Sequence, residues 1–178
     1  MHTKQTIIII GAASEQGRFI AKSLLRGNYR LLLNDKNEAK LSELLGEVDE
    51  RNLHADVEAI DCSFEGCWEA DIIICAVPQN EEKEVAERIR EVANQKIVIS
   101  FNAIPEVKNE ELQVLLPNSK VVNVAIRTFG LNPQPTNPHP DAFISGKDVE
   151  ALQTVAELLT TAGSTVVVKD GAIEIKTN

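Results

Sequence analysis

The sequence is poor in the residues from which several common classes of site are built. Its 178 residues include three cysteines, three histidines, one tryptophan and one tyrosine. The cysteines are odd in number and none is spaced C-x-x-C, which argues against a disulfide framework and against a zinc site. We therefore expect Cys62, Cys67 and Cys75 to be small apolar residues in a reducing compartment.

The sequence also lacks a long hydrophobic run and an excess of basic residues. No apolar stretch approaches the roughly 20 residues that cross a bilayer, and the first five residues show no signal-peptide pattern, so we expect a cytoplasmic protein with no membrane partner. The net charge is −9, and from Asp35 to Asp71 twelve acidic residues face three basic ones. Because nucleic-acid binding needs clustered Lys and Arg, we expect no nucleic-acid partner.

The sequence does contain a regular alternation of apolar, β-branched segments with helical patterns, which is typical of an α/β protein. We predict a doubly wound, mostly parallel, Rossmann-like sheet, and the turn pair Asp170–Gly171 predicts a C-terminal β-hairpin at one edge. The length favours one NAD(P)-binding domain over residues 1–178 with no separate substrate domain. Strands are predicted at residues 6–10, 30–34, 52–57, 71–77, 96–100, 121–124, 142–145 and 165–168, and helical spacing marks residues 17–25, 38–45, 85–93 and 148–162.

The stretch IGAASEQG, residues 10–17, joins the first strand to the first helix. In such units glycines permit a tight turn and close helix packing, while the helix N-terminus faces the phosphates of a dinucleotide. Gly11 and Gly17 supply these two functions, but Ser14 occupies the middle position, where its Cβ would push the phosphates away or its hydroxyl would donate to one of them. The predicted pyrophosphate loop comprises Gly11, Ala13, Ser14, Glu15, Gln16 and Gly17.

An acidic residue ends the second predicted strand. Asp35 stands where a carboxylate accepts hydrogen bonds from an adenosine ribose; the alternative is a helix N-cap for the segment that starts at Asn37. Lys36 either turns toward a 2′-phosphate or lies in solvent. Since Asp35 would repel a 2′-phosphate, the sequence favours NAD(H) over NADP(H).

Other candidate residues follow later strands, whose carboxyl ends face the ligand in doubly wound sheets. Ala76, Val77 and Pro78 are predicted to contact the cofactor. Asn102 and Arg127 are the candidate catalytic residues, although each is equally consistent with a loop residue that bonds backbone carbonyls. His139, in the proline-rich segment 131–140, is either a proton carrier or an ordinary exposed histidine, and the histidines lack the spacing of a metal site.

With these residues in view, the chain resembles the NADP oxidoreductases that depend on the deazaflavin coenzyme F420. The loop of that family, G-G-T-G-D-Q-G, is matched at Gly11, Gln16 and Gly17, and the segment ADIIICAVP resembles its fourth strand. The resemblance implies direct hydride transfer between nicotinamide and deazaflavin, which needs two aligned rings and little acid or base catalysis. The family carries Ser or Thr and then Arg after its second strand, where Asp35 and Lys36 stand here.

Three functions remain open on the sequence alone. The first is an NAD(P)-dependent oxidoreductase that passes hydride to or from a flavin, a deazaflavin or a small carbonyl compound. The second is a non-catalytic NAD(P)-binding module that serves a partner, and the third is a domain like the N-terminal one of prephenate or β-hydroxyacid dehydrogenases. Short-chain dehydrogenases are set aside, because Tyr29 is the only tyrosine and is not followed by their Tyr-x-x-x-Lys pattern. The edge strand predicted at 172–176 and an open cleft would suit a homodimer.

Overall fold

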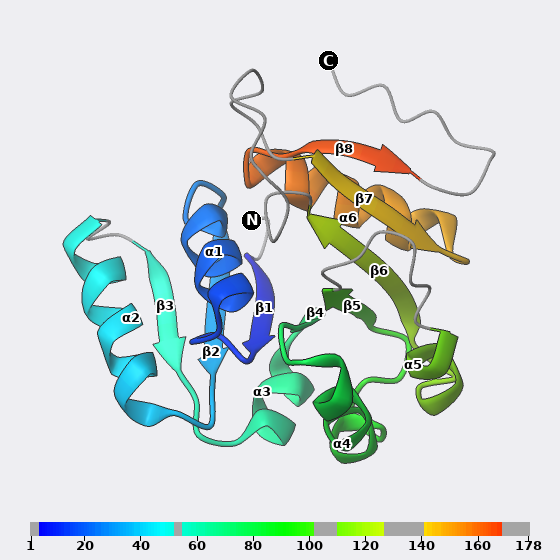
Figure 1. The fold of residues 1–178 in the computed structure, drawn as a ribbon, viewed down its shortest axis with the longest axis horizontal. Coiled ribbons are helices and arrows are strands. Elements are labelled where there is room, and N and C mark those ends of the chain that lie inside the picture. Colours follow the sequence, from blue (N-terminus) through cyan, green and yellow to red (C-terminus); the bar gives the residue numbers. More distant parts are fainter. Residues whose placement is uncertain (1–3, 52–54, 102–109, 127–140, 169–178) are drawn as a thin grey trace.

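The computed structural model describes residues 4–51, 55–101, 110–126 and 141–168. They form one eight-stranded sheet in the order β3-β2-β1-β4-β5-β6-β7-β8, with helices on both faces (Figure 1). The strands are β1 Gln5–Ile10, β2 Tyr29–Asn34, β3 Asp56–Ala59, β4 Ile72–Cys75, β5 Ile97–Phe101, β6 Lys120–Ile126, β7 Asp141–Gly146 and β8 Thr165–Val168. The helices are α1 Glu15–Leu24, α2 Glu38–Arg51, α3 Ser63–Glu69, α4 Gln79–Ile89, α5 Glu110–Leu115 and α6 Val149–Thr161.

The sheet is parallel except at one place. Strands β3, β2, β1, β4, β5 and β6 pair in parallel, β7 runs antiparallel to β6, and β8 is again parallel to β7. The strand order reverses between β1 and β4, which is the switch point at which doubly wound sheets open a crevice for ligands. The predicted fold class, a doubly wound and mostly parallel α/β sheet, is confirmed.

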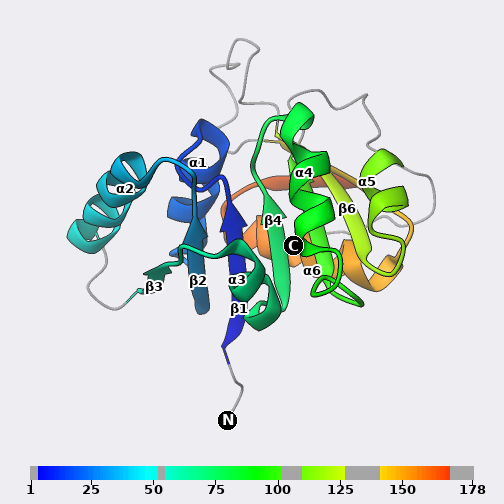
Figure 2. The ribbon, with the colours of Figure 1, turned by 90° about the horizontal axis from the view of Figure 1, so that it is seen from below.

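Successive residues of the central strands pack into two separate apolar layers. Ile7 and Ile9 of β1 face a cluster that includes residues of α1, α2 and α6, whereas Ile8 and Ile10 face residues of α3, α4 and α5. Figures 1 and 2 show these two groups of helices on opposite sides of the sheet. Continuous isoleucine in β1 therefore reflects burial on both faces.

Several predicted bounds were wrong. The third strand, expected at 52–57, lies at Asp56–Ala59, and α2 continues to Arg51 because Val48 extends its buried stripe. Helix α4 ends at Ile89, before 93. Helices α3 and α5 were not predicted, since they have seven and six residues and too few turns for a helical period to show.

Two of the three cysteines are buried, as expected, but Cys62 is exposed. It directly precedes α3, a short helix that also carries the single tryptophan, Trp68, with 70% of its surface exposed. The ammonium group of Lys96 donates hydrogen bonds to the carbonyl oxygens of Cys67 and Trp68. These carbonyls lie in the last turn of α3, where they have no partner inside the helix.

Some predictions fall outside the residues that the structure describes. They concern the hairpin after Val168, the proline-rich segment 131–140, Asn102, Arg127 and the three histidines. Within the described residues, no helix is both long enough and apolar enough to span a membrane.

Candidate functional site

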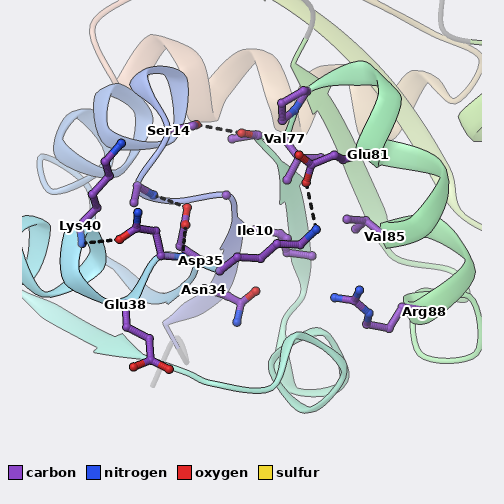
Figure 3. Close-up of a pocket in the computed structure, with 16 residues that line it drawn as sticks. Ile10, Ser14, Asn34, Asp35, Glu38, Lys40, Val77, Glu81, Val85 and Arg88 are labelled. Carbon is purple, nitrogen blue, oxygen red and sulfur yellow. Dashed lines mark hydrogen bonds and ion pairs between the residues drawn. The ribbon is translucent and has the colours of Figure 1, made fainter.

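A cleft of about 700 Å³ opens at the carboxyl ends of β1, β2 and β4, next to the switch point of the sheet (Figure 3). Its walls come from the β1–α1 turn, the end of β2 with the start of α2, the end of β4, and α4. The lining residues are Ile10, Gly11, Ala13, Ser14, Asn34, Asp35, Lys36, Asn37, Glu38, Lys40, Ala76, Val77, Pro78, Glu81, Val85 and Arg88.

The β1–α1 turn requires glycine at two positions. Gly11 has a φ of +81°, and a Cβ there would lie 2.6 Å from the carbonyl oxygen of Ala76, the residue that directly follows β4. A Cβ on Gly17 would lie 2.2 Å from the carbonyl oxygen of Gly11. Both distances are below van der Waals contact, so these glycines allow the turn to approach β4 and the helix to approach the turn.

Ser14 is the N-cap of α1. Its Oγ accepts a hydrogen bond from the backbone N–H of Gly17, at 3.0 Å, and donates one to the carbonyl of Ala76, at 2.8 Å. The hydroxyl proton is therefore directed at the residue that follows β4, and both sequence-based interpretations of how Ser14 meets a phosphate stay predictions. The predicted residues Glu15, Gln16 and Gly17 lie in the first turn of α1 and are not among the residues that line the cleft. Backbone N–H groups in this turn have no acceptor inside the helix backbone.

Asp35 connects the ends of β1 and β2 through the backbone. Its Oδ2 accepts from the N–H of Ala13 and its Oδ1 from the N–H of Asn37, both at 2.8 Å. The helix-cap role falls to Asn37, whose Oδ1 accepts from the N–H of Lys40. Each carboxylate oxygen of Asp35 keeps a second lone pair, so the group can still accept from a ligand hydroxyl in the cleft.

Lys36 reaches across the cleft to α4. Its Nζ lies 3.1 Å from Oε2 of Glu81 and 3.8 Å from Oε2 of Glu84. The Lys36 side chain is still 64% exposed, so its position is compatible with the solvent alternative, and the contact with a 2′-phosphate stays a prediction. The charged residues in the lining are balanced, with Asp35, Glu38 and Glu81 against Lys36, Lys40 and Arg88.

Sequence reasoning missed the whole contribution of α4. Glu81, Val85 and Arg88 point from one face of this helix toward the end of β2 (Figure 3). Their spacing of four and three residues places them on one helix face, and this pattern was available in the sequence. The predicted residues Ala76, Val77 and Pro78 do line the cleft.

A buried polar pair joins β5 to α4. Oγ of Ser100, on β5, donates to Oε1 of Glu82 at 2.5 Å, and both residues are buried. Burial also raises the pKa of the neighbouring Cys75 thiol far above its ordinary value. In the described part of the chain, no group of three or more His, Cys, Asp or Glu side chains is arranged to hold a metal ion.

The sequence pattern of a known family covers more than half of the chain. The family described as NADP oxidoreductase, coenzyme F420-dependent, matches residues 6–104. The chain belongs to this family. The matched region runs from β1 to just beyond β5 and includes all residues that line the cleft.

Solved structures share the fold at low sequence identity. A protein from Arthrobacter sp. assigned as an F420-dependent NADP-reductase has a TM-score of 0.70 and 20% identity, over 91% of this chain and 82% of that one. Plasmodium falciparum pyrroline carboxylate reductase with NADP bound has a TM-score of 0.67 and 14% identity, over 96% and 59%. Prephenate dehydrogenase from A. aeolicus, in complex with hydroxyphenyl propionate and NAD⁺, has a TM-score of 0.74 and 16% identity, over 94% of this chain and 60% of that one.

These comparisons show the fold and the family. The chain spans about 60% of the length of the two dehydrogenase and reductase structures named last. No curated protein sequence matches the chain.

Proposed function

We propose that this chain binds NAD(H) in the cleft beside Asp35 and transfers hydride between the nicotinamide and a flavin-like, deazaflavin-like or small carbonyl acceptor. The observation that carries the proposal is the turn of Gly11, which brings the N-terminus of α1 to the switch point of the sheet with Asp35 beside it. Membership of the F420-dependent family supports the reaction type.

The cleft offers a place for each part of a dinucleotide. The N-terminal turn of α1 supplies N–H groups and the positive end of a helix dipole to the pyrophosphate. Asp35 accepts from the hydroxyls of the adenosine ribose, and Val85 supplies an apolar surface on α4. Ala76, Val77 and Pro78 continue the cleft toward the nicotinamide end.

The chemistry needs little from acidic or basic side chains. When bound, the nicotinamide supplies or accepts the hydride. The residues of this chain bind the cofactor, orient it and exclude water from it, and these roles account for a large part of the rate in reactions between two aligned rings.

Two features of the cleft favour NAD(H) over NADP(H). The carboxylate of Asp35 stands at the ribose position and would repel a 2′-phosphate, and the nearest cation after β2, Lys36, already contacts Glu81. Pairing of Lys36 leaves less positive charge for a phosphate than the sequence alone suggests.

The proposal is tested in two steps: nucleotide binding is measured first, and turnover with an acceptor is measured second. The melting temperature of the whole chain is measured with NAD⁺, NADH, NADP⁺ and NADPH, since a ligand at about 100 times its Kd adds roughly 2.7 kcal/mol. We expect the larger rise with NADH and NAD⁺. Oxidation of NADH is then followed with a flavin, a deazaflavin and a panel of small carbonyl compounds.

Each outcome has a distinct meaning. Turnover with an acceptor supports the oxidoreductase. Tight binding without turnover by any acceptor supports a cofactor-binding module instead. No rise in melting temperature with any of the four nucleotides contradicts the proposal.

A further inference from the structure

An ion pair joins the two walls of the cleft. Lys36 follows β2, whereas Glu81 lies in the first turn of α4, 45 positions further along the chain. Their side chains meet at 3.1 Å, and both residues line the cleft (Figure 3). The contact depends on the fold alone, because no local sequence pattern relates the two residues.

The ion pair is part of a short chain of charges along α4. Glu84, one turn after Glu81, lies 3.8 Å from Lys36 and also accepts a 2.6 Å bond from Arg88. Arg88 lines the same cleft. Lys36 and Arg88, two cations that line the cleft, are therefore both paired with glutamates of α4.

Glu81 is the principal partner of Lys36. Its distance to Lys36 is shorter than that of Glu84, and its side chain is 36% exposed against 60% for Glu84. A less exposed pair is screened less by water. Glu84 divides its contacts between Lys36 and Arg88, whereas no second ion-pair partner is recorded for Glu81 in the described part of the chain.

We propose that Glu81 is a specificity-determining residue that excludes NADP(H) by holding Lys36. This inference rests on the proposed function of the cleft. Lys36 stands next to Asp35, on the ribose side, where a 2′-phosphate would lie. A phosphate there gains a charge-assisted bond from Lys36 only if the lysine leaves Glu81, and Glu81 itself repels the phosphate. The barrier to NADP(H) thus comes from α4 as well as from Asp35 after β2.

The test compares two variants, each of which replaces one glutamate of α4 by glutamine. Glu81→Gln removes the partner of Lys36, and Glu87→Gln makes the same charge change at an exposed position of α4 outside the cleft lining. Kd values for NADH and NADPH are measured by calorimetry on the full chain. We expect the ratio Kd(NADPH)/Kd(NADH) to fall about tenfold in Glu81→Gln, the size of one hydrogen bond to a charged group, and to stay unchanged in Glu87→Gln.

Two further variants identify Lys36 as the residue that responds. In the double variant Glu81→Gln with Lys36→Gln, the gain for NADPH should disappear. Lys36→Gln alone should leave the ratio within about twofold, because under the proposal Lys36 contacts Glu81 and makes no bond to a 2′-phosphate in the native protein. A large loss of NADPH affinity in Lys36→Gln would mean that Lys36 binds the phosphate in the native protein, and would overturn the inference even if Glu81→Gln failed to fold.

Failure of the inference and failure of the proposed function give different results. If NADH binds and the ratio does not change in Glu81→Gln, Glu81 has no role in specificity, and the proposed function stands. If the native chain and all variants bind neither nucleotide, the proposed function fails and the inference fails with it.

Discussion

Oδ2 of Asp35 accepts a hydrogen bond from the backbone N–H of Ala13, so the side chain at the end of β2 fixes the loop that follows β1. Ala13 is buried, and its N–H would be costly to leave without an acceptor. The same carboxylate therefore has a structural function before any ligand arrives, and a function in ligand binding under our proposal.

Replacement of Asp35 should affect both functions. In Asp35→Ala we expect a loss of about 1–3 kcal/mol in the free energy of unfolding, from the unpaired N–H of Ala13, and at least a roughly tenfold weaker Kd for NADH. Urea unfolding and calorimetry measure the two effects. Asp49→Ala, at an exposed position of α2, is the control, and unchanged NADH affinity in Asp35→Ala would contradict the ribose assignment.

The glycines of the chain should differ sharply in their tolerance of alanine. Gly17→Ala places a Cβ 2.2 Å from the carbonyl oxygen of Gly11, and we expect it to cost about 3 kcal/mol or more. Gly46 lies inside α2, and a Cβ added there would have nothing within 4 Å, so Gly46→Ala should gain about 0.5–1 kcal/mol. Thermal unfolding of both variants tests this, and equal effects would show that α1 does not pack as described.

Much of the fold followed from the sequence, because burial on both faces makes strands visible as continuous apolar runs. Ile7 to Ile10 and Ile72 to Cys75 are such runs, and both are central strands. Edge strand β3 has exposed residues and was placed too early in the chain. The antiparallel pairing of β7 with β6 could not be read from periodicity, which is the same in both strand directions.

Candidate site residues that belong to a local sequence pattern could be predicted. Contacts between segments that are distant in the sequence could not. Gly11, Gly17 and Asp35 follow from a local strand–turn–helix pattern. The bond from Ser14 to Ala76 and the ion pair from Lys36 to Glu81 join residues far apart in the chain. Such contacts depend on how the segments that follow β1, β2 and β4 meet at one edge of the sheet, and only the folded structure contains that information.

Ser14 should tolerate glycine better than alanine. In Ser14→Ala, α1 loses its N-cap and the carbonyl of Ala76 loses a donor, and we expect a cost of about 1 kcal/mol or somewhat more. In Ser14→Gly the cap loss should be only a few tenths of a kcal/mol, and NADH affinity should be kept, since the loop of the F420-dependent family has glycine at this position. Weaker NADH binding in Ser14→Gly than in Ser14→Ala would argue against this account.

The buried bond between Ser100 and Glu82 should contribute to stability. Ser100→Ala removes a donor from a buried carboxylate, and we expect a loss of about 1–3 kcal/mol in the free energy of unfolding. Ser42→Ala, at an exposed position of α2, should change it by less than about 0.5 kcal/mol. Urea unfolding of the two variants, measured side by side, compares a buried serine with an exposed one, and equal values would contradict the role of the bond.

The thiols should differ in reactivity. Cys62 is exposed. Burial raises the pKa of the Cys67 thiol to about 12 and raises the pKa of the Cys75 thiol far above its ordinary value. We expect one thiol to react rapidly with a disulfide reagent at neutral pH in the native chain, and three after unfolding. Rapid reaction of two or three thiols in the native chain would show that the core around β4 opens readily.

The same burial makes stability depend on alkaline pH. Below the ordinary thiol pKa of 9.0 both the folded and the unfolded chain keep the proton of Cys67. As the pH rises from there toward about 12, the unfolded chain loses that proton first, so stability falls across this interval. Melting temperatures measured against pH should fall less steeply in Cys67→Ala than in the native chain, and parallel curves would contradict the assignment.

The exposed position of Trp68 on α3 determines what fluorescence can report. Its side chain is already largely exposed in the native chain, so we expect the emission wavelength to shift little on unfolding, and circular dichroism is the better probe of the transition. The sequence holds no other tryptophan, so all indole emission comes from one known place outside the cleft lining. Energy transfer from this single donor to reduced nicotinamide would then report occupancy of the cleft without any added label.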